Sequence, residues 1–194
     1  TLGRESCNLM TYHMQQVTGF PTERVIGQAG VLDSARMAHF IALELGCAEE
    51  DVSPMVLGGH GDSMVPLPKY TTVGGIPITQ LMSEETIAAI SDRTAKGGGE
   101  IVKLLERGSA FYAPGSAAAI MAESVLNDRK RVIPASCHLS GEYGLENIYI
   151  GVPCIIGANG VEKIFELELT ESEMESLHGS ANFYKSQLVD ILGY

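Results

Sequence analysis

The sequence predicts an α+β fold in which long helices pack on antiparallel strands. Two observations lead to this prediction. Apolar residues recur at helical spacing through the first and middle parts of the chain, and a cluster of β-prone segments followed by one closing helix comes after them. In addition, no Gly-x-Gly-x-x-Gly turn joins a strand to a helix, so the sequence shows no self-contained site for a dinucleotide or a nucleoside triphosphate.

The helices are predicted from apolar spacing and from signals at their ends. Gly46 ends the second helix, and Thr170 with Glu173 forms a capping box that starts the last one. Gly97-Gly98-Gly99 lies inside the third helix, where glycine lowers helix propensity and indicates either a close packing contact or a break. The predicted ranges are 10–18, 34–45, 83–105, 117–126 and 170–192.

The strands are predicted from short apolar runs that glycines and prolines bound. The first run ends abruptly at Gly58-Gly59-His60-Gly61-Asp62, and an extended region with three prolines follows it. Gly-rich turns join the later strands, which favours antiparallel pairing. The predicted ranges are 52–57, 65–78 for the extended region, 131–139, 148–156 and 161–167.

Composition excludes several classes of function. The chain has 194 residues and a net charge of −11, and this acidity argues against a nucleic-acid partner, because binding phosphates requires a basic surface. No apolar run approaches the roughly 18 residues that span a membrane. The four cysteines show no C-x-x-C pair and no metal-ligand spacing, which favours reduced thiols in a cytoplasmic protein over the alternative of a disulfide.

His60 is the strongest candidate for a chemical role. It stands between glycines at the end of an apolar strand, so that a ligand can approach its ring closely. Imidazole is the side chain best suited to exchanging a proton near neutral pH. The simpler alternative is a surface histidine in a turn, but the surrounding glycines favour a functional role.

Asp33 and Arg36 form the second candidate group. They are three residues apart at a predicted helix start and therefore project from neighbouring positions on one face. One interpretation is a helix N-cap with a surface ion pair of little energetic value. In the other, the carboxylate fixes the tautomer of an imidazole and the guanidinium binds a substrate carboxylate through two donors. The residues alone leave both interpretations open.

These segments resemble the malate/lactate dehydrogenase superfamily. The matching residues are Arg24-Val25-Ile26-Gly27-Gln28-Ala29-Gly30-Val31-Leu32-Asp33-Ser34-Ala35-Arg36 and Gly58-Gly59-His60-Gly61-Asp62-Ser63-Met64-Val65-Pro66. Further matches lie at 96–101, 108–114, 143–144, 151–153, 157 and 160–162. Gly59 is typical of the lactate-dehydrogenase-like malate dehydrogenases of bacteria, whereas lactate dehydrogenases usually carry glutamate there. The resemblance covers nearly all of the chain from about Met10.

The resemblance implies a reaction and a set of roles. The reaction is the reversible oxidation of (S)-malate to oxaloacetate by NAD. His60 exchanges the hydroxyl proton, Asp33 orients it and Arg36 binds the substrate carboxylate. Ala110 contributes to the pocket wall near the reacting carbon, and Leu32 lies near the nicotinamide. A homo-oligomer, a dimer or a tetramer, in the cytoplasm is implied as well, with no metal.

The chain departs from the family pattern at its start. The nucleotide-binding (Rossmann) half of the family and its loop with two further arginines have no counterpart here, and Glu5 stands where the family has a substrate-contacting asparagine. We therefore expect 1–9 to be a junction or a divergent start, and 10–194 to be the substrate-binding and catalytic domain of a truncated malate dehydrogenase. The alternatives are a non-catalytic oligomerisation module or pseudoenzyme, and a lactate dehydrogenase.

We expect the 194-residue chain alone to show negligible turnover, because its sequence carries no motif for binding the hydride carrier. The measurement is oxaloacetate-dependent oxidation of NADH, followed by absorbance. Ordinary turnover by this polypeptide alone would contradict the expectation. Sizing together with intact mass tests the oligomerisation-module alternative, which requires a monodisperse assembly of these chains.

Overall fold

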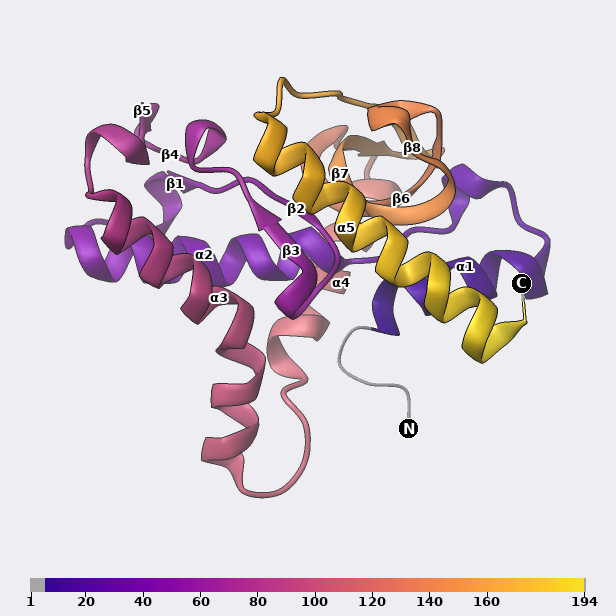
Figure 1. Cartoon of the computed structure of the whole chain (residues 1–194), viewed down its shortest axis with the longest axis horizontal. Helices are drawn as coiled ribbons and strands as arrows, with labels where there is room; N and C mark the ends of the chain where they lie inside the picture. The colour runs from indigo at the N-terminus through magenta and orange to yellow at the C-terminus, as the bar shows by residue number, and fades with distance from the viewer. Residues whose placement is uncertain (1–5, 194) are drawn as a thin grey trace.

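The computed structural model describes residues 6–193 and confirms the predicted α+β class. Figure 1 shows the helix α5 crossing in front of the main sheet while α2 runs behind it. The helices are α1 (Ser6–Thr18), α2 (Ala29–Leu45), α3 (Glu84–Leu105), α4 (Tyr112–Leu126) and α5 (Glu171–Gln187), and a π-helical turn, Leu188–Leu192, continues α5.

The strands form two antiparallel sheets. The main sheet has the order β3-β2-β7-β6, and β8 also pairs with β7. A small sheet has the order β1-β4-β5. The main strands are β2 (Val56–Gly58), β3 (Met64–Pro66), β6 (Arg131–Ser140), β7 (Glu146–Gly157) and β8 (Gly160–Ile164), and the small ones are β1 (Val52–Ser53), β4 (Thr72–Val73) and β5 (Ile76–Pro77).

Several predicted boundaries are wrong. The range 52–57 is two strands in different sheets, which separate at Pro54, a residue that cannot donate a ladder hydrogen bond. Helix α2 begins at Ala29 rather than Ser34, so Asp33 and Arg36 lie in the body of the helix and Asp33 is not an N-cap. Helices α1 and α4 also begin earlier than predicted, at Ser6 and Tyr112.

Other boundaries agree with the prediction. The capping box of Thr170 and Glu173 is formed, and Gly46 ends α2 in the left-handed conformation with φ of 65°. The predicted junction at 1–9 falls partly outside the described residues, as does Glu5, whereas its last residues begin α1. Within residues 6–193, none of the helices combines the length and the apolar composition needed to cross a membrane.

The main core lies between the curved sheet and the helices that cover it. Most of its buried members come from β6, β7 and α5, and a second cluster joins α2 to α3. These two clusters meet along α2, which carries residues of both and so holds Asp33 between them. The fully buried large side chains include Tyr149, Tyr184, Met37, Ile41, Leu57, Leu67, Leu139, Ile150 and Leu177.

One buried hydrogen bond fastens α4 to the sheet. The Ser124 hydroxyl donates to the Ile156 carbonyl oxygen over 2.6 Å, and neither residue is exposed. A matched serine lies on the surface of α5, where the Ser176 hydroxyl donates to the Ser172 carbonyl oxygen over 2.8 Å.

We predict that Ser124→Ala lowers the free energy of unfolding by about 1 kcal/mol, because a buried hydrogen bond is lost. For a chain of this size that corresponds to a fall of roughly 2–4 °C in Tm. Ser176→Ala, the control, should stay within about 0.5 kcal/mol of the parent, since water replaces its exposed bond. Thermal unfolding followed by circular dichroism measures both, and equal shifts in the two variants would contradict the prediction.

Candidate active site

His60 lies at the tip of the hairpin formed by β2 and β3. Gly58 pairs with Met64 across this hairpin, and a short 3₁₀ turn, Gly61–Ser63, closes it directly after the histidine. The His60 side chain is 19% exposed, so its ring is held by the protein and still reaches the surface. The hairpin thus presents one imidazole at the end of a buried strand.

Asp33 reaches His60 from α2. Its Oδ2 lies 2.9 Å from His60 Nδ1, and the Asp33 side chain has no solvent exposure. A carboxylate accepts hydrogen bonds and does not donate them, so Nδ1 carries the proton and donates it. In the neutral ring Nε2 is then left unprotonated and able to accept a proton. This pair can therefore act as a general base with a defined tautomer.

Arg36 extends the same group along α2. Its Nη1 lies 3.5 Å from Asp33 Oδ1, an ion pair across one helical turn. The side chain is only 11% exposed, and its buried Nε has no hydrogen-bond partner among the described residues. Burial lowers the pKa of the Arg36 guanidinium, and the negative charge of Asp33 opposes that effect. A buried guanidinium with an uncommitted donor suits an anionic ligand.

Helix α3 approaches Arg36 through its glycines. A Cβ on Gly98 would lie 3.1 Å from Arg36 Nη2, and one on Gly97 would lie 3.3 Å from Arg36 Cδ. The helix runs unbroken from Glu84 to Leu105, so the glycine run marks a close packing contact rather than a break. The absence of side chains at these positions lets the α3 backbone lie against the guanidinium.

The two remaining predicted site residues stand elsewhere. Leu32 is buried in the main core one residue before Asp33. Ala110 is half-buried in the connection between α3 and α4. The hydrogen bond and the ion pair that join His60, Asp33 and Arg36 do not involve either of them, and their roles remain predictions.

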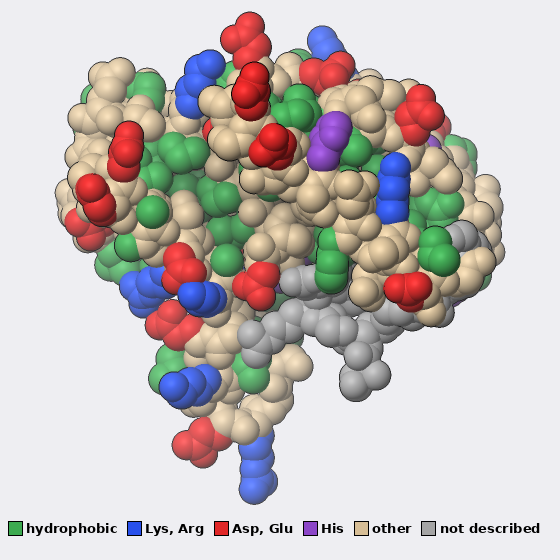
Figure 2. Space-filling model, viewed as in Figure 1, with side chains coloured by type: hydrophobic (Ala, Val, Ile, Leu, Met, Phe, Trp, Pro, Cys, Tyr) green, Lys and Arg blue, Asp and Glu red, His purple; other side chains and the backbone are tan. Residues whose placement is uncertain are grey.

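A charged cavity of about 570 Å³ opens beside the turn that follows His60. It lies between that turn and one face of α3, and its lining is Gly61, Asp62, Ala95, Lys96, Gly99, Glu100 and Lys103. On the face that Figure 2 shows, acidic and basic side chains are interspersed rather than gathered into one basic patch. Among the described residues, no group of three His, Cys, Asp or Glu side chains is placed to hold a metal ion.

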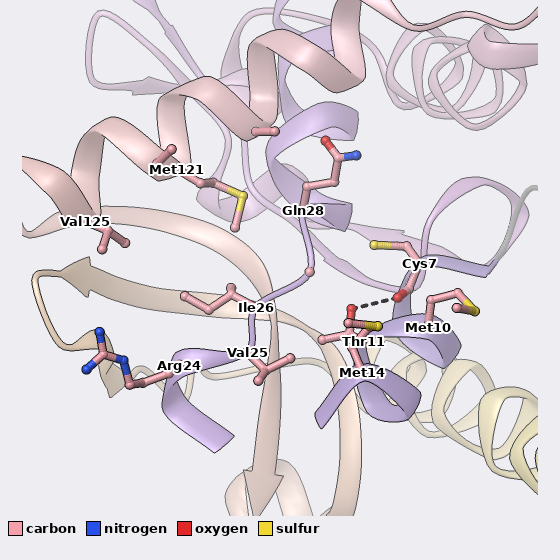
Figure 3. Close-up of a pocket in the computed structure, with 13 residues that line it drawn as sticks. Cys7, Met10, Thr11, Met14, Arg24, Val25, Ile26, Gln28, Met121 and Val125 are labelled. Carbon is pink, nitrogen blue, oxygen red and sulfur yellow. Dashed lines mark hydrogen bonds between the residues drawn. The ribbon is translucent and has the colours of Figure 1, made fainter. Parts of the chain in front are cut away.

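A second cavity, of about 500 Å³, lies between α1, residues 24–28 and α4 (Figure 3). It is mostly apolar, and its lining contains none of the five predicted site residues. Cys7 and Thr11 face each other on its α1 side, where the Thr11 hydroxyl donates to the Cys7 carbonyl oxygen over 2.7 Å. Burial raises the pKa of the Cys7 thiol.

Two side chains of α5 that touch the His60 loop were not predicted from the sequence. The Gly59 N–H donates to Ser180 Oγ over 3.0 Å, and the His60 N–H donates to Tyr184 Oη over 3.4 Å. These residues are more than 120 positions away in sequence, and only the periodicity of the last helix could have marked them as inward-facing.

Comparison with known proteins identifies the family of the chain. Residues 30–192 match the family model of the lactate/malate dehydrogenase, alpha/beta C-terminal domain. A malate dehydrogenase of Roseiflexus sp. (strain RS-1) is 56% identical over 92% of this chain, and the match covers 58% of that protein. The chain thus spans less than two thirds of the length of the curated relatives that it matches.

Solved structures show the same relationship. The structure of malate dehydrogenase from Salinibacter ruber matches with a TM-score of 0.94 and 49% identity, over 96% of this chain and 61% of that one. The lactate dehydrogenase of Eimeria maxima, solved with NADH and oxamate, matches with a TM-score of 0.91 and 43% identity, over 96% of this chain and 60% of that one. The chain therefore belongs to the lactate/malate dehydrogenase family, of which it contains the α/β C-terminal domain.

Proposed function

We propose that this chain supplies the substrate-binding and proton-transfer part of an NAD-dependent malate dehydrogenase. The observation that carries the proposal is the buried Asp33 carboxylate, which contacts both His60 and Arg36. The names of the curated relatives support malate over lactate, since malate dehydrogenases are 52–59% identical to this chain. Identity to solved structures does not separate the two substrates, because the malate dehydrogenases there are 38–49% identical and the lactate dehydrogenases 43%.

In this proposal His60 moves the proton. When malate is oxidised, a hydride leaves its C2 carbon and the proton of its hydroxyl group must be accepted at the same time. His60 Nε2 accepts that proton, while Asp33 stabilises the imidazolium that forms. In the reverse direction the imidazolium returns the proton to the oxygen of oxaloacetate. Proton transfer of this kind contributes roughly 10²- to 10⁴-fold to the rate.

Arg36 binds the carboxylate next to the reacting carbon. Two parallel N–H donors of the guanidinium would fix the acid in one orientation relative to His60. The ion pair with Asp33 already offsets part of the free-energy cost of burying the guanidinium. This binding energy orients the hydroxyl-bearing carbon for reaction.

NAD is the proposed hydride carrier. When bound, it would accept the hydride that leaves the C2 carbon of malate. The site fits this carrier, because His60 supplies a proton-accepting base and Arg36 supplies a group that binds the substrate carboxylate. These are the groups that the substrate side of a hydride transfer needs. Of this chain's residues we assign only Leu32 to the cofactor side, and Ala110 to the wall of the substrate pocket. We further propose that the enzyme is a cytoplasmic homo-oligomer.

The test uses a chimera in which this chain follows the part of the Roseiflexus malate dehydrogenase that precedes the matched segment. We expect it to oxidise NADH with oxaloacetate. His60→Gln should lower kcat by about 10²-fold or more. Arg36→Lys should lower kcat/KM by about 100-fold, because an ammonium cannot form the paired bonds.

Two exposed residues provide matched controls. His39, which pairs with Glu49, and Arg129, which pairs with Glu123, are half-exposed. His39→Gln and Arg129→Lys should leave kcat and KM within about twofold of the parent, since surface ion pairs contribute little. An active chimera in which His60→Gln keeps its full rate would overturn the proposed role, and a folded chimera that reduces pyruvate but not oxaloacetate would overturn the proposed substrate.

A further inference from the structure

The C-terminal helix α5 packs against the hairpin that carries His60. It meets both β2 and β3, and two of its buried side chains, Ser180 and Tyr184, reach the loop between these strands. Figure 1 shows α5 next to the strands β2 and β3. The histidine loop therefore lies between α2, which carries Asp33, and α5, which closes the other side.

Three hydrogen bonds join α5 to this loop. Ser180 Oγ accepts from the Gly59 N–H over 3.0 Å, and Tyr184 Oη accepts from the His60 N–H over 3.4 Å. The hydroxyl groups of Tyr184 and Ser63 also lie 3.0 Å apart. Tyr184 is 2% exposed and Ser180 is 5% exposed, so water cannot readily replace these partners if they are removed.

Tyr184 also explains why position 59 is glycine. A Cβ on Gly59 would collide with Tyr184 Oη, with the ring carbon Cε2 of Tyr184 and with the Ser63 hydroxyl oxygen. The ring is buried and cannot move aside without leaving a cavity in the core. Glycine at position 59 is thus required in part by a tyrosine on the last helix.

We propose that Tyr184 is the positioning residue of His60, acting with Ser180 and requiring glycine at position 59. Asp33 fixes the imidazole ring at Nδ1, and Tyr184 fixes the backbone of the same residue from the opposite side. With both ends held, Nε2 keeps one direction towards the substrate. The catalytic importance of this positioning rests on the proposed function, whereas the positioning itself concerns only this chain.

The test measures how fast the Nδ1 proton of His60 exchanges with solvent. In the 194-residue chain labelled with ¹⁵N, this proton is shielded from water by its bond to Asp33, and NMR gives its exchange rate. We expect Tyr184→Phe to speed the exchange roughly three- to tenfold, the factor that one lost hydrogen bond corresponds to. No turnover is needed, so failure of the chimera assay and failure of this test are separate outcomes.

Tyr143→Phe is the matched control. Tyr143 is another buried tyrosine, whose hydroxyl donates to the Phe165 carbonyl oxygen over 2.8 Å and accepts from the Leu167 N–H over 3.0 Å. Its removal should lower Tm without changing the exchange of the His60 proton. If exchange is raised equally in both variants, the effect of Tyr184 is merely structural. If exchange is unchanged in both, Tyr184 does not position His60. Either result would overturn the proposal.

A second pair of variants decides the matter if Tyr184→Phe does not fold. Gly59→Ala should shift the His60 resonances and speed the exchange of the Nδ1 proton, because the added methyl group displaces Tyr184. Gly179→Ala, on α5 with nothing within 4 Å of the added carbon, should leave both unchanged. A folded Gly59→Ala variant whose His60 signals match those of the parent chain would overturn the proposal.

Discussion

The buried carboxylate of Asp33 is the charge on which the rest of the site depends. A carboxylate without solvent exposure is costly unless charged or hydrogen-bonded partners compensate it, and here His60 and Arg36 contact its two oxygens. The same atoms that reduce this cost determine the chemistry. One oxygen is hydrogen-bonded to the imidazole and the other lies 3.5 Å from the guanidinium, so the proton-transfer group and the anion-binding group stand beside the same carboxylate.

The fold surrounds this charge with rigid elements. Helix α2 carries Asp33 and Arg36 between two apolar clusters, and α3 presses its glycines against the guanidinium. The hairpin of β2 and β3 brings His60 from the opposite direction, and α5 closes the loop behind it. Several packed elements thus support the functional groups, which limits how far any one can move independently.

Local sequence patterns predicted the fold class and the capping box at Thr170, because each depends on neighbouring residues. These patterns failed where contacts between residues far apart in the sequence determine the structure. Helix α2 begins before the predicted start, with Gly30 in its first turn packed so closely against Pro134 and the Val56 carbonyl that no Cβ would fit. Asp33 was therefore placed wrongly at a helix end. Tyr184 was missed since its contact with His60 spans 124 positions of sequence.

The tautomer of His60 tests the central claim most directly. In the folded 194-residue chain, long-range ¹H–¹⁵N correlation spectra distinguish protonation at Nδ1 from protonation at Nε2. If the Asp33 carboxylate directs the ring, the neutral imidazole carries its proton on Nδ1 alone, and Asp33→Asn, whose amide can donate as well as accept, allows the other tautomer. A parent chain with the proton on Nε2, or with a mixture that Asp33→Asn does not change, would contradict this account.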